Sequence, residues 1–252
     1  MLSPHPVDAR MGGMDDHPGR RGSVAWRLDE VASAGRENLD PAHVARYDDK
    51  EDAQAAGEVE LLRTLGLDAA STVVDLGAGT GQFTVAVAPW CARAVAVDVS
   101  PVMLDRLEAK VAGLPNVELA HAGFLSYEHR GAPADVVYSR WALHHLPDFW
   151  KVVALARLRS ILRTGGLLRL VDIAYSFGPQ QAEQGIEAWR ASFPAEAGAG
   201  EWVRGDIDEH VRDEHSTFTW LLEAMIERND FRIEHTEHSP EGMQAAYVAR
   251  AV

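Results

Sequence analysis

The sequence predicts a doubly wound α/β fold, in which helices cover both faces of a mostly parallel sheet. From residue 72 onward, apolar runs of strand length alternate with stretches of helical length. The apolar runs are nearly continuous in valine, leucine and alanine, which is typical of parallel strands buried on both faces. A glycine-rich turn joins the first run to the helix that follows it. A chain of 252 residues is long enough for one large domain with its own core.

The N-terminal quarter predicts an arm followed by two helices. Residues 1–24 are rich in Pro, Gly, Asp and Arg and carry no apolar periodicity, so we expect a mobile arm there and a single domain over 25–252. Asp40 precedes a proline that suits the first helical position, which predicts a short helix over about 41–47. A second helix is expected over about 51–64.

The alternating region and the C-terminal tail supply the remaining elements. Strands are predicted at 72–76, 94–99, 117–121, 135–139 and 166–173, with helices at 81–90, 101–112 and 148–163 between them. Residues 177–215 combine helix breakers with aromatic residues, as expected of an insertion. A helix at about 216–228 and strands at 231–235 and 244–252 complete the chain.

Composition narrows the class of function. The chain has 38 acidic and 24 basic residues, for a net charge of −14. This balance disfavours binding of nucleic acid through its phosphates. Cys91 is the only cysteine, which excludes a disulfide framework and a cysteine-rich zinc site. Neither a membrane span nor a secretory signal is recognisable, so we expect a cytoplasmic protein without a membrane partner.

The sharpest motif is the glycine turn, which reads D-L-G-A-G-T-G-Q over Asp75 to Gln82. Its G-x-G-x-G spacing differs from the G-x-G-x-x-G of dinucleotide sites. Asp75 would repel a pyrophosphate but would suit a ligand with an ammonium group. Asp98 ends the second apolar run, where an acid accepts hydrogen bonds from ribose hydroxyls. S-adenosylmethionine has an ammonium, a sulfonium and no phosphate. The alternatives to S-adenosylmethionine are a dinucleotide ligand, or a strand–helix turn that binds no ligand.

These motifs resemble the class I S-adenosylmethionine-dependent methyltransferases, in particular the branch that acts on small molecules. The resemblance covers about residues 40–175 with motifs and the rest more loosely. It implies a Rossmann-like seven-stranded sheet whose last two strands form a hairpin. It also implies a cofactor-binding core over about 40–175 and a helical lid over about 177–220, inserted before those two strands.

The resemblance, together with the glycine turn and its two acids, predicts a set of cofactor-binding residues. Tyr47 would lie over the methionine end of the cofactor. Gly123 stands where the family usually has an acid that binds the adenine amino group, so backbone contact and Phe124 are expected to replace it. The full set expected to bind S-adenosylmethionine is Tyr47, Asp75, Gly77, Ala78, Gly79, Gly81, Gln82, Asp98, Val99, Met103, Gly123, Phe124, Ser139, Arg140 and Trp141.

Methyl transfer is an in-line displacement and mainly requires alignment of the nucleophile. His144 and His145 follow the fourth strand and are the candidate catalytic bases, although they could simply cap the loop. We expect no metal, because among strand-end carboxylates only Asp172 qualifies and the His210/His215 spacing lacks a supporting ligand set. Aromatic residues of the insertion predict an apolar substrate pocket, or alternatively a core of their own.

The function expected from the sequence is methyl transfer from S-adenosylmethionine to O, N or C of a small metabolite. The product would be S-adenosylhomocysteine. The chain lacks the Asn/Asp-Pro-Pro-aromatic run of adenine methylases, and Cys91 lies away from the position of a cytosine-methylating nucleophile. A protein or nucleic-acid methyltransferase, or a non-catalytic cofactor-binding module, are the alternatives.

Overall fold

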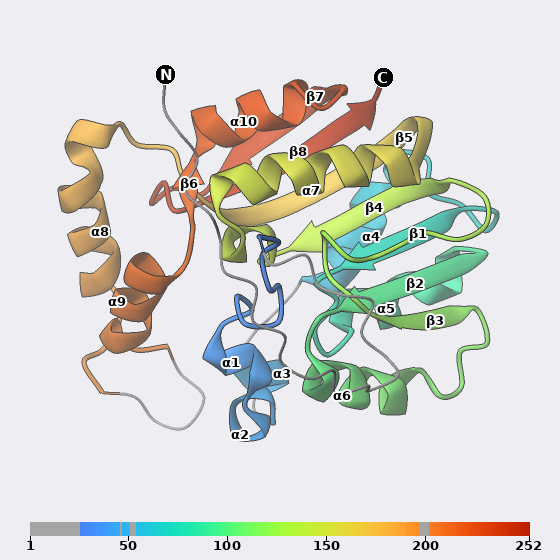
Figure 1. Cartoon of the computed structure of the whole chain (residues 1–252), viewed down its shortest axis with the longest axis horizontal. Coiled ribbons are helices and arrows are strands. Elements are labelled where there is room, and N and C mark those ends of the chain that lie inside the picture. Colours follow the sequence, from blue (N-terminus) through green and yellow to red (C-terminus); the bar gives the residue numbers. More distant parts are fainter. Residues whose placement is uncertain (1–25, 46, 51–53, 197–201) are drawn as a thin grey trace, which may run out of the picture.

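The computed structural model describes residues 26–45, 47–50, 54–196 and 202–252. The expected N-terminal arm and the first residues of the helix expected at 51–64 lie outside the described residues. Figure 1 shows one central sheet with helices on both sides, and the arrowhead of β4 points toward α1–α3, α8 and α9. The predicted doubly wound α/β fold is therefore confirmed.

The sheet has the strand order β3-β2-β1-β4-β5-β8-β7. β1 to β5 run parallel, whereas β8 is antiparallel to both β5 and β7, as expected for a terminal hairpin. The two-residue strand β6 (Thr217–Phe218) pairs with the end of β5 outside this order. The other strands are β1 (Thr72–Leu76), β2 (Arg93–Asp98), β3 (Val117–His121), β4 (Ala134–Arg140), β5 (Leu162–Tyr175), β7 (Phe231–His238) and β8 (Gln244–Ala251).

Several predicted boundaries differ from the structure, and in two cases the start of an element is wrong. β5 begins at Leu162, paired with Ala134, because the strand continues through an irregularity in register that the Gly165-Gly166 pair concealed. The helix expected from Ser216 begins only at Thr219, since Thr217 and Phe218 extend alongside Ala174 and Tyr175 instead.

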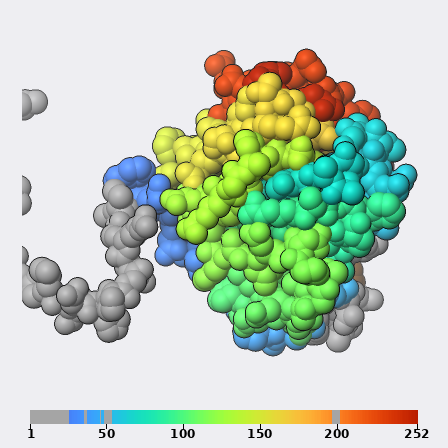
Figure 2. Space-filling view, turned by 90° about the vertical axis from the view of Figure 1, so that its right-hand side faces the viewer, coloured from blue at the N-terminus to red at the C-terminus, as the bar shows by residue number. Residues whose placement is uncertain are grey.

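Helices cover the two faces of the sheet in separate groups. On one face lie α4 (Ala55–Thr64), α5 (Gln82–Val87) and α6 (Pro101–Val111), and on the other lie α7 (Asp148–Ile161) and α10 (Thr219–Glu227). The short 3-10 helix η1 (Ala88–Trp90) follows α5. Figure 2 places the red C-terminal residues at one end of the molecule, above the cyan and green residues of the sheet. Apolar side chains thus fill both spaces between helices and sheet, as the continuous apolar strands require.

The N-terminal helices are shorter than predicted. Asp40 caps a helix as expected, accepting from the Ala42 amide at 2.8 Å. The helix expected over 41–47 is instead divided into α2 (Pro41–Val44) and α3 (Tyr47–Lys50), preceded by α1 (Arg36–Leu39). These helices lie beside the carboxyl ends of the parallel strands (Figure 1).

The segment between β5 and β6 holds the 3-10 helix η3 (Pro179–Gln181) and helices α8 (Ala182–Ala191) and α9 (Arg204–Asp213). Arg190 of α8 joins Asp208 of α9 through a 2.6 Å ion pair. Both helices lie past the carboxyl ends of the strands (Figure 1), where ligands of doubly wound sheets bind. Within the described residues, every helix is too short or too polar to cross a membrane.

Candidate functional site

The glycine turn between β1 and α5 is shaped by close backbone approaches. Gly77, Gly79 and Gly81 all have positive φ, at 74°, 53° and 85°. A Cβ at Gly77 would lie 2.3 Å from the Cβ of Ala142, and a Cβ at Gly81 would lie 1.9 Å from Cδ1 of Leu107. Gly77 therefore lets the turn lie against the loop after β4, and Gly81 lets α5 start against α6.

Two buried carboxylates stand beside this turn. Asp98, at the end of β2, accepts from the Gly79 and Ser100 amides, both at 2.8 Å. Burial raises the pKa of Asp98. Asp75 accepts from the Thr84 hydroxyl at 2.5 Å, and burial, reinforced by the charge of Asp98, raises its pKa to about 7. The pair concentrates negative charge at the carboxyl ends of β1 and β2.

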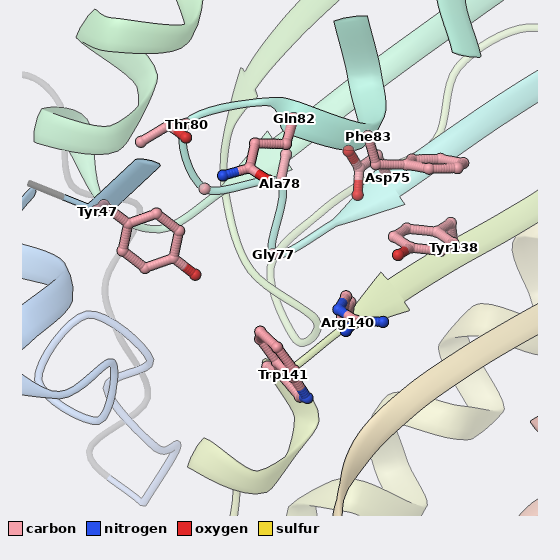
Figure 3. Close-up of a pocket in the computed structure, with 11 residues that line it drawn as sticks. Tyr47, Asp75, Gly77, Ala78, Thr80, Gln82, Phe83, Tyr138, Arg140 and Trp141 are labelled. Carbon is pink, nitrogen blue, oxygen red and sulfur yellow. The ribbon is translucent and has the colours of Figure 1, made fainter. Parts of the chain in front are cut away.

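Three cavities meet at this edge of the sheet. The loop cavity, shown in Figure 3, is lined mainly by the glycine turn and the end of β4. The Asp98 cavity, of about 70 Å³, lies between the end of β2 and the loop after β3. The large cavity, of about 370 Å³, extends from the loop after β4 to α9 and to aromatic residues of the insertion. Tyr47 and Trp141 line all three.

Most predicted cofactor-binding residues line the first two cavities. Around the loop cavity are Tyr47, Asp75, Gly77, Ala78, Gly79, Gln82, Arg140 and Trp141. Around the Asp98 cavity are Asp98, Val99, Met103, Gly123 and Phe124. Gly81 and Ser139 line none of the three cavities. Ser139 is fully buried beneath the site, and Gly81 packs against α6.

Arg140 is held by a buried charge network that the sequence analysis missed. Glu58 of α4 binds Arg169 of β5 through two bonds of 2.7 and 2.9 Å and lies 3.9 Å from the Arg140 guanidinium. The Nε of Arg140 is buried and has no hydrogen-bond partner. Nothing in the sequence indicates that Glu58 pairs with these arginines, because both lie on strands far away in the chain.

The N-terminal segment closes over the site. Thr80 and Gln82 of the glycine turn and Lys110 of α6 all donate to Asp48, with the lysine at 2.6 Å and the glutamine at 3.2 Å. These bonds hold α3, and with it Tyr47, against the turn. Tyr47 lies opposite the glycine turn in Figure 3. Tyr47 was predicted from the sequence to lie at the cofactor, but the neighbouring Asp48 supplies the attachment.

Glu30 occupies the space left free by Gly123. It accepts from the Leu125 amide and the Ser126 hydroxyl, both at 2.8 Å, and burial raises its pKa. A Cβ at Gly123 would lie 2.4 Å from Glu30 Oε1. The sequence analysis did not anticipate an acid reaching this place from the N-terminal segment.

A buried histidine cluster forms one wall of the large cavity. His144 Nδ1 lies 2.5 Å from Asp172 Oδ1, and its Nε2 lies 3.1 Å from Glu214 Oε2. Burial favours the neutral imidazole, but the two carboxylates outweigh it and raise the pKa of His144 to about 9. His145 beside it is also buried, and burial together with the charge of His144 lowers its pKa to about 3.

His210 completes this cluster, although the sequence analysis set it aside. Its Nδ1 contacts Glu214 Oε2, its Nε2 lies 2.9 Å from Ser216 Oγ, and the edge of its ring meets Trp189. His215, which the sequence paired with His210 as a possible metal ligand, contributes its backbone instead. Its amide donates to the carbonyl of His144 at 2.9 Å.

Comparisons with known proteins agree with this geometry. Residues 73–166 match a family described as a methyltransferase domain. An uncharacterized methyltransferase of Geobacillus kaustophilus is 28% identical over 190 residues, which cover 75% of this chain and 81% of the relative. A trans-aconitate 2-methyltransferase of Methylobacterium radiotolerans is 34% identical over 130 residues, or 51% of this chain and 46% of that protein.

The fold also matches a solved structure of the same kind. N-methyltransferase NodS from Bradyrhizobium japonicum, crystallised with S-adenosylhomocysteine, superposes with a TM-score of 0.60 at 16% identity and covers 88% of this chain and 98% of that one. The fold match, the strand–glycine turn–helix unit, the acid at the end of β2 and the methyltransferase relatives lead to one assignment. The chain belongs to the class I S-adenosylmethionine-dependent methyltransferases, and S-adenosylmethionine is its cofactor.

Proposed function

We propose that this enzyme transfers the methyl group of S-adenosylmethionine to O, N or C of a small metabolite. The observation that carries the proposal is the large cavity, whose volume of about 370 Å³ lies within the range of small-molecule sites. It meets the loop cavity at Tyr47 and Trp141, so a small acceptor there would approach the methyl donor directly.

The donor would lie across the loop cavity and the Asp98 cavity. Arg140 supplies a cation for its carboxylate, and Asp75 supplies an anion for its ammonium group. Asp98 keeps acceptor capacity for the ribose hydroxyls, since each of its oxygens holds one amide bond. Val99, Met103 and Phe124 form the apolar wall suited to adenine.

The acceptor would be held between aromatic residues and the two histidines that follow β4. Trp189, Phe193 and Trp202 line the large cavity together with His144 and His145. In the transfer, a lone pair of the acceptor forms a bond to the methyl carbon as the carbon–sulfur bond breaks. The electron pair of that bond stays on sulfur, which becomes the neutral thioether of S-adenosylhomocysteine, and a proton carried by the acceptor atom passes to solvent water.

The histidines differ in what they can offer the acceptor. Both ring nitrogens of His144 already face carboxylates, Asp172 and Glu214. The buried Nδ1 of His145 has no hydrogen-bond partner. We therefore assign acceptor hydrogen bonding to His145 and a positioning role to His144.

The test follows a labelled methyl group. The enzyme is incubated with methyl-labelled S-adenosylmethionine and cell extract divided into metabolite, protein and nucleic-acid fractions. Label should enter the metabolite fraction. Label confined to protein or nucleic acid would support the macromolecular alternative, and donor binding without transfer to any fraction would support a non-catalytic module.

A matched pair of variants tests the acceptor cavity itself. Trp189→Ala removes a wall of the large cavity, whereas Trp220→Ala removes a tryptophan that is 55% exposed on α10. The first should lower kcat/KM for the acceptor without changing the affinity for S-adenosylhomocysteine, and the second should change neither. Equal effects of the two variants would contradict the assignment.

A further inference from the structure

Three side chains with metal-ligating atoms converge on the wall of the large cavity. His144 lies in the 3-10 helix η2 (Leu143–His145), His210 lies in α9, and Glu214 follows α9 directly. Each offers one ligand atom, and these three atoms lie within 4.8 Å of one another. All three residues line the cavity. Two imidazole nitrogens and one carboxylate oxygen are a donor set that divalent transition metals accept.

One carboxylate oxygen, Glu214 Oε2, stands at the centre of this group. It is buried, contacts His210 Nδ1 and lies 3.1 Å from His144 Nε2, so one nitrogen of each imidazole faces the same oxygen. An ion bound at ordinary zinc–ligand distances holds ligand atoms about 2.9 Å apart in octahedral and about 3.3 Å apart in tetrahedral geometry. The 3.1 Å between His144 Nε2 and Glu214 Oε2 lies between these two values, whereas His210 Nδ1 and Glu214 Oε2 lie closer together and would have to separate to hold an ion.

In each imidazole, the nitrogen that faces away from Glu214 already has a hydrogen-bonding partner. His144 Nδ1 lies 2.5 Å from Asp172, which is buried and also accepts from the Ile173 amide at 2.9 Å. His210 Nε2 lies 2.9 Å from Ser216 Oγ. The remaining nitrogens, His144 Nε2 and His210 Nδ1, both face Glu214 Oε2, and an ion would lie among these three atoms. Histidines that bind metals usually have their second nitrogen fixed in this way.

The backbone around the cluster is fixed by independent contacts. The His215 amide donates to the His144 carbonyl at 2.9 Å, which ties the residue after Glu214 to η2. The buried Lys151 donates to the His215 carbonyl and also pairs with Asp148 at 2.8 Å. Because β6 begins two residues later, paired with β5, both sides of the cluster rest on the sheet.

We propose that His144, His210 and Glu214 bind a divalent transition-metal ion, with Zn²⁺ as the reference ion. No metal was predicted from the sequence, because His210 and His215 have no supporting ligand set near them in the chain. His144 and His210 meet only because α9 folds back over the loop after β4. Mg²⁺ fits the site less well, because it prefers an all-oxygen shell.

An ion at this place would keep open positions toward the large cavity. An oxygen of the acceptor, from a hydroxyl or a carboxylate, could fill such a position and be held beside the methyl donor. A metal-bound hydroxyl loses its proton more readily, which would favour O-methylation. This step rests on the proposed function, whereas the metal site itself does not.

Metal binding is measured on the full chain without acceptor. Chelator-treated protein is titrated with Zn²⁺ against a chromogenic chelator, and with Co²⁺ followed by its visible absorption. We expect one equivalent of Zn²⁺ and an intense Co²⁺ spectrum typical of low coordination number. No stoichiometric uptake, or competition by equimolar Mg²⁺, would overturn the proposal.

Variants locate the site. His210→Ala and the nearly isosteric Glu214→Gln should each weaken Zn²⁺ binding by at least about tenfold. His235→Ala is the matched control, because that imidazole also contacts a carboxylate, Glu237 at 2.8 Å, but on the exposed β7. Unchanged Zn²⁺ affinity in both cluster variants would place the ion elsewhere. Retained affinity for S-adenosylhomocysteine shows that each variant is folded.

The two proposals fail separately. One bound Zn²⁺ without transfer to any metabolite would leave the site standing and remove the proposed function. Transfer to a metabolite by protein that takes up no Zn²⁺ would support the proposed function and remove the metal site.

Discussion

The enzyme should bind its methyl donor more tightly as the pH rises toward 7, because Asp75, the proposed partner of the donor's ammonium group, must be ionised to attract it. Burial raises the pKa of Asp75 to about 7, with repulsion from Asp98 adding to the rise and the Thr84 hydroxyl opposing it. Arg140 and Tyr138 also line the loop cavity. Since the donor stabilises the ionised form, binding and loss of the proton are linked.

The size of the effect follows from that pKa. If only ionised Asp75 binds, the apparent Kd is proportional to 1 + 10^(pKa − pH). With a pKa of about 7, the Kd at pH 5.5 exceeds that at pH 7.5 roughly 25-fold.

The raised pKa of Asp75 has the opposite consequence for the unliganded protein, whose free energy of unfolding should fall as the pH rises. The folded state holds the Asp75 proton more tightly than the unfolded chain does, so stability is lost as the pH rises from the unfolded value near 3.8 through about 7. The loss is about 4 kcal/mol at most.

Isothermal titration with S-adenosylhomocysteine at pH 5.5, 6.5 and 7.5 measures the linkage. Asp75→Asn should bind more weakly at pH 7.5 and show a nearly flat profile. Asp105→Asn, which changes an exposed acid on α6, should retain the wild-type slope. A wild-type Kd that is equal at pH 5.5 and 7.5, or an Asp75→Asn profile as steep as the wild type, would refute the reasoning.

Three further changes test the site's framework. Asp98→Ala should raise the Kd for S-adenosylhomocysteine about 10- to 100-fold by titration calorimetry, and an unchanged Kd would exclude the ribose role. Glu58→Gln should lower the free energy of unfolding in urea by about 3–5 kcal/mol, because it leaves buried guanidinium groups uncompensated, while the exposed Glu60→Gln should have little effect. Gly81→Ala should cost about 2 kcal/mol or more, since its φ is 85° and the new Cβ would lie 1.9 Å from Leu107. The cost of Gly81→Ala should be smaller in a Leu107→Ala background, and an equal cost would contradict the packing role.

The elements that could be predicted are those defined by local pattern. β1 and β3 have the predicted bounds, because an apolar run between turn residues defines a strand wherever it pairs. Asp40 caps α2 for a similarly local reason. The glycine turn was recognisable because its backbone requires positive φ at spacings that few other turns share.

The remaining parts of the site depend on contacts between distant residues. Glu58 and Arg169 are separated by 111 positions, and each alone reads as an ordinary surface residue. Glu30 reaches Leu125 from the N-terminal segment. Single-sequence patterns carry no record of such pairs, because charged residues are normally exposed and their burial becomes visible only when the partner is placed.

Trp141 lies where the loop cavity and the large cavity meet. Its φ is 49°, a conformation that is costly for a bulky residue and that gave no sequence signal, since no glycine marks it. Its amide donates to the Val171 carbonyl at 2.8 Å, and the Arg140 guanidinium lies 4.1 Å from the centre of its ring. These contacts hold a sharp turn at the end of β4, which leaves Arg140 at the loop cavity and brings His144 to the large cavity a few residues later. The strain at one residue therefore brings the proposed donor-binding cation and the proposed metal ligand to two neighbouring cavities that Trp141 lines together.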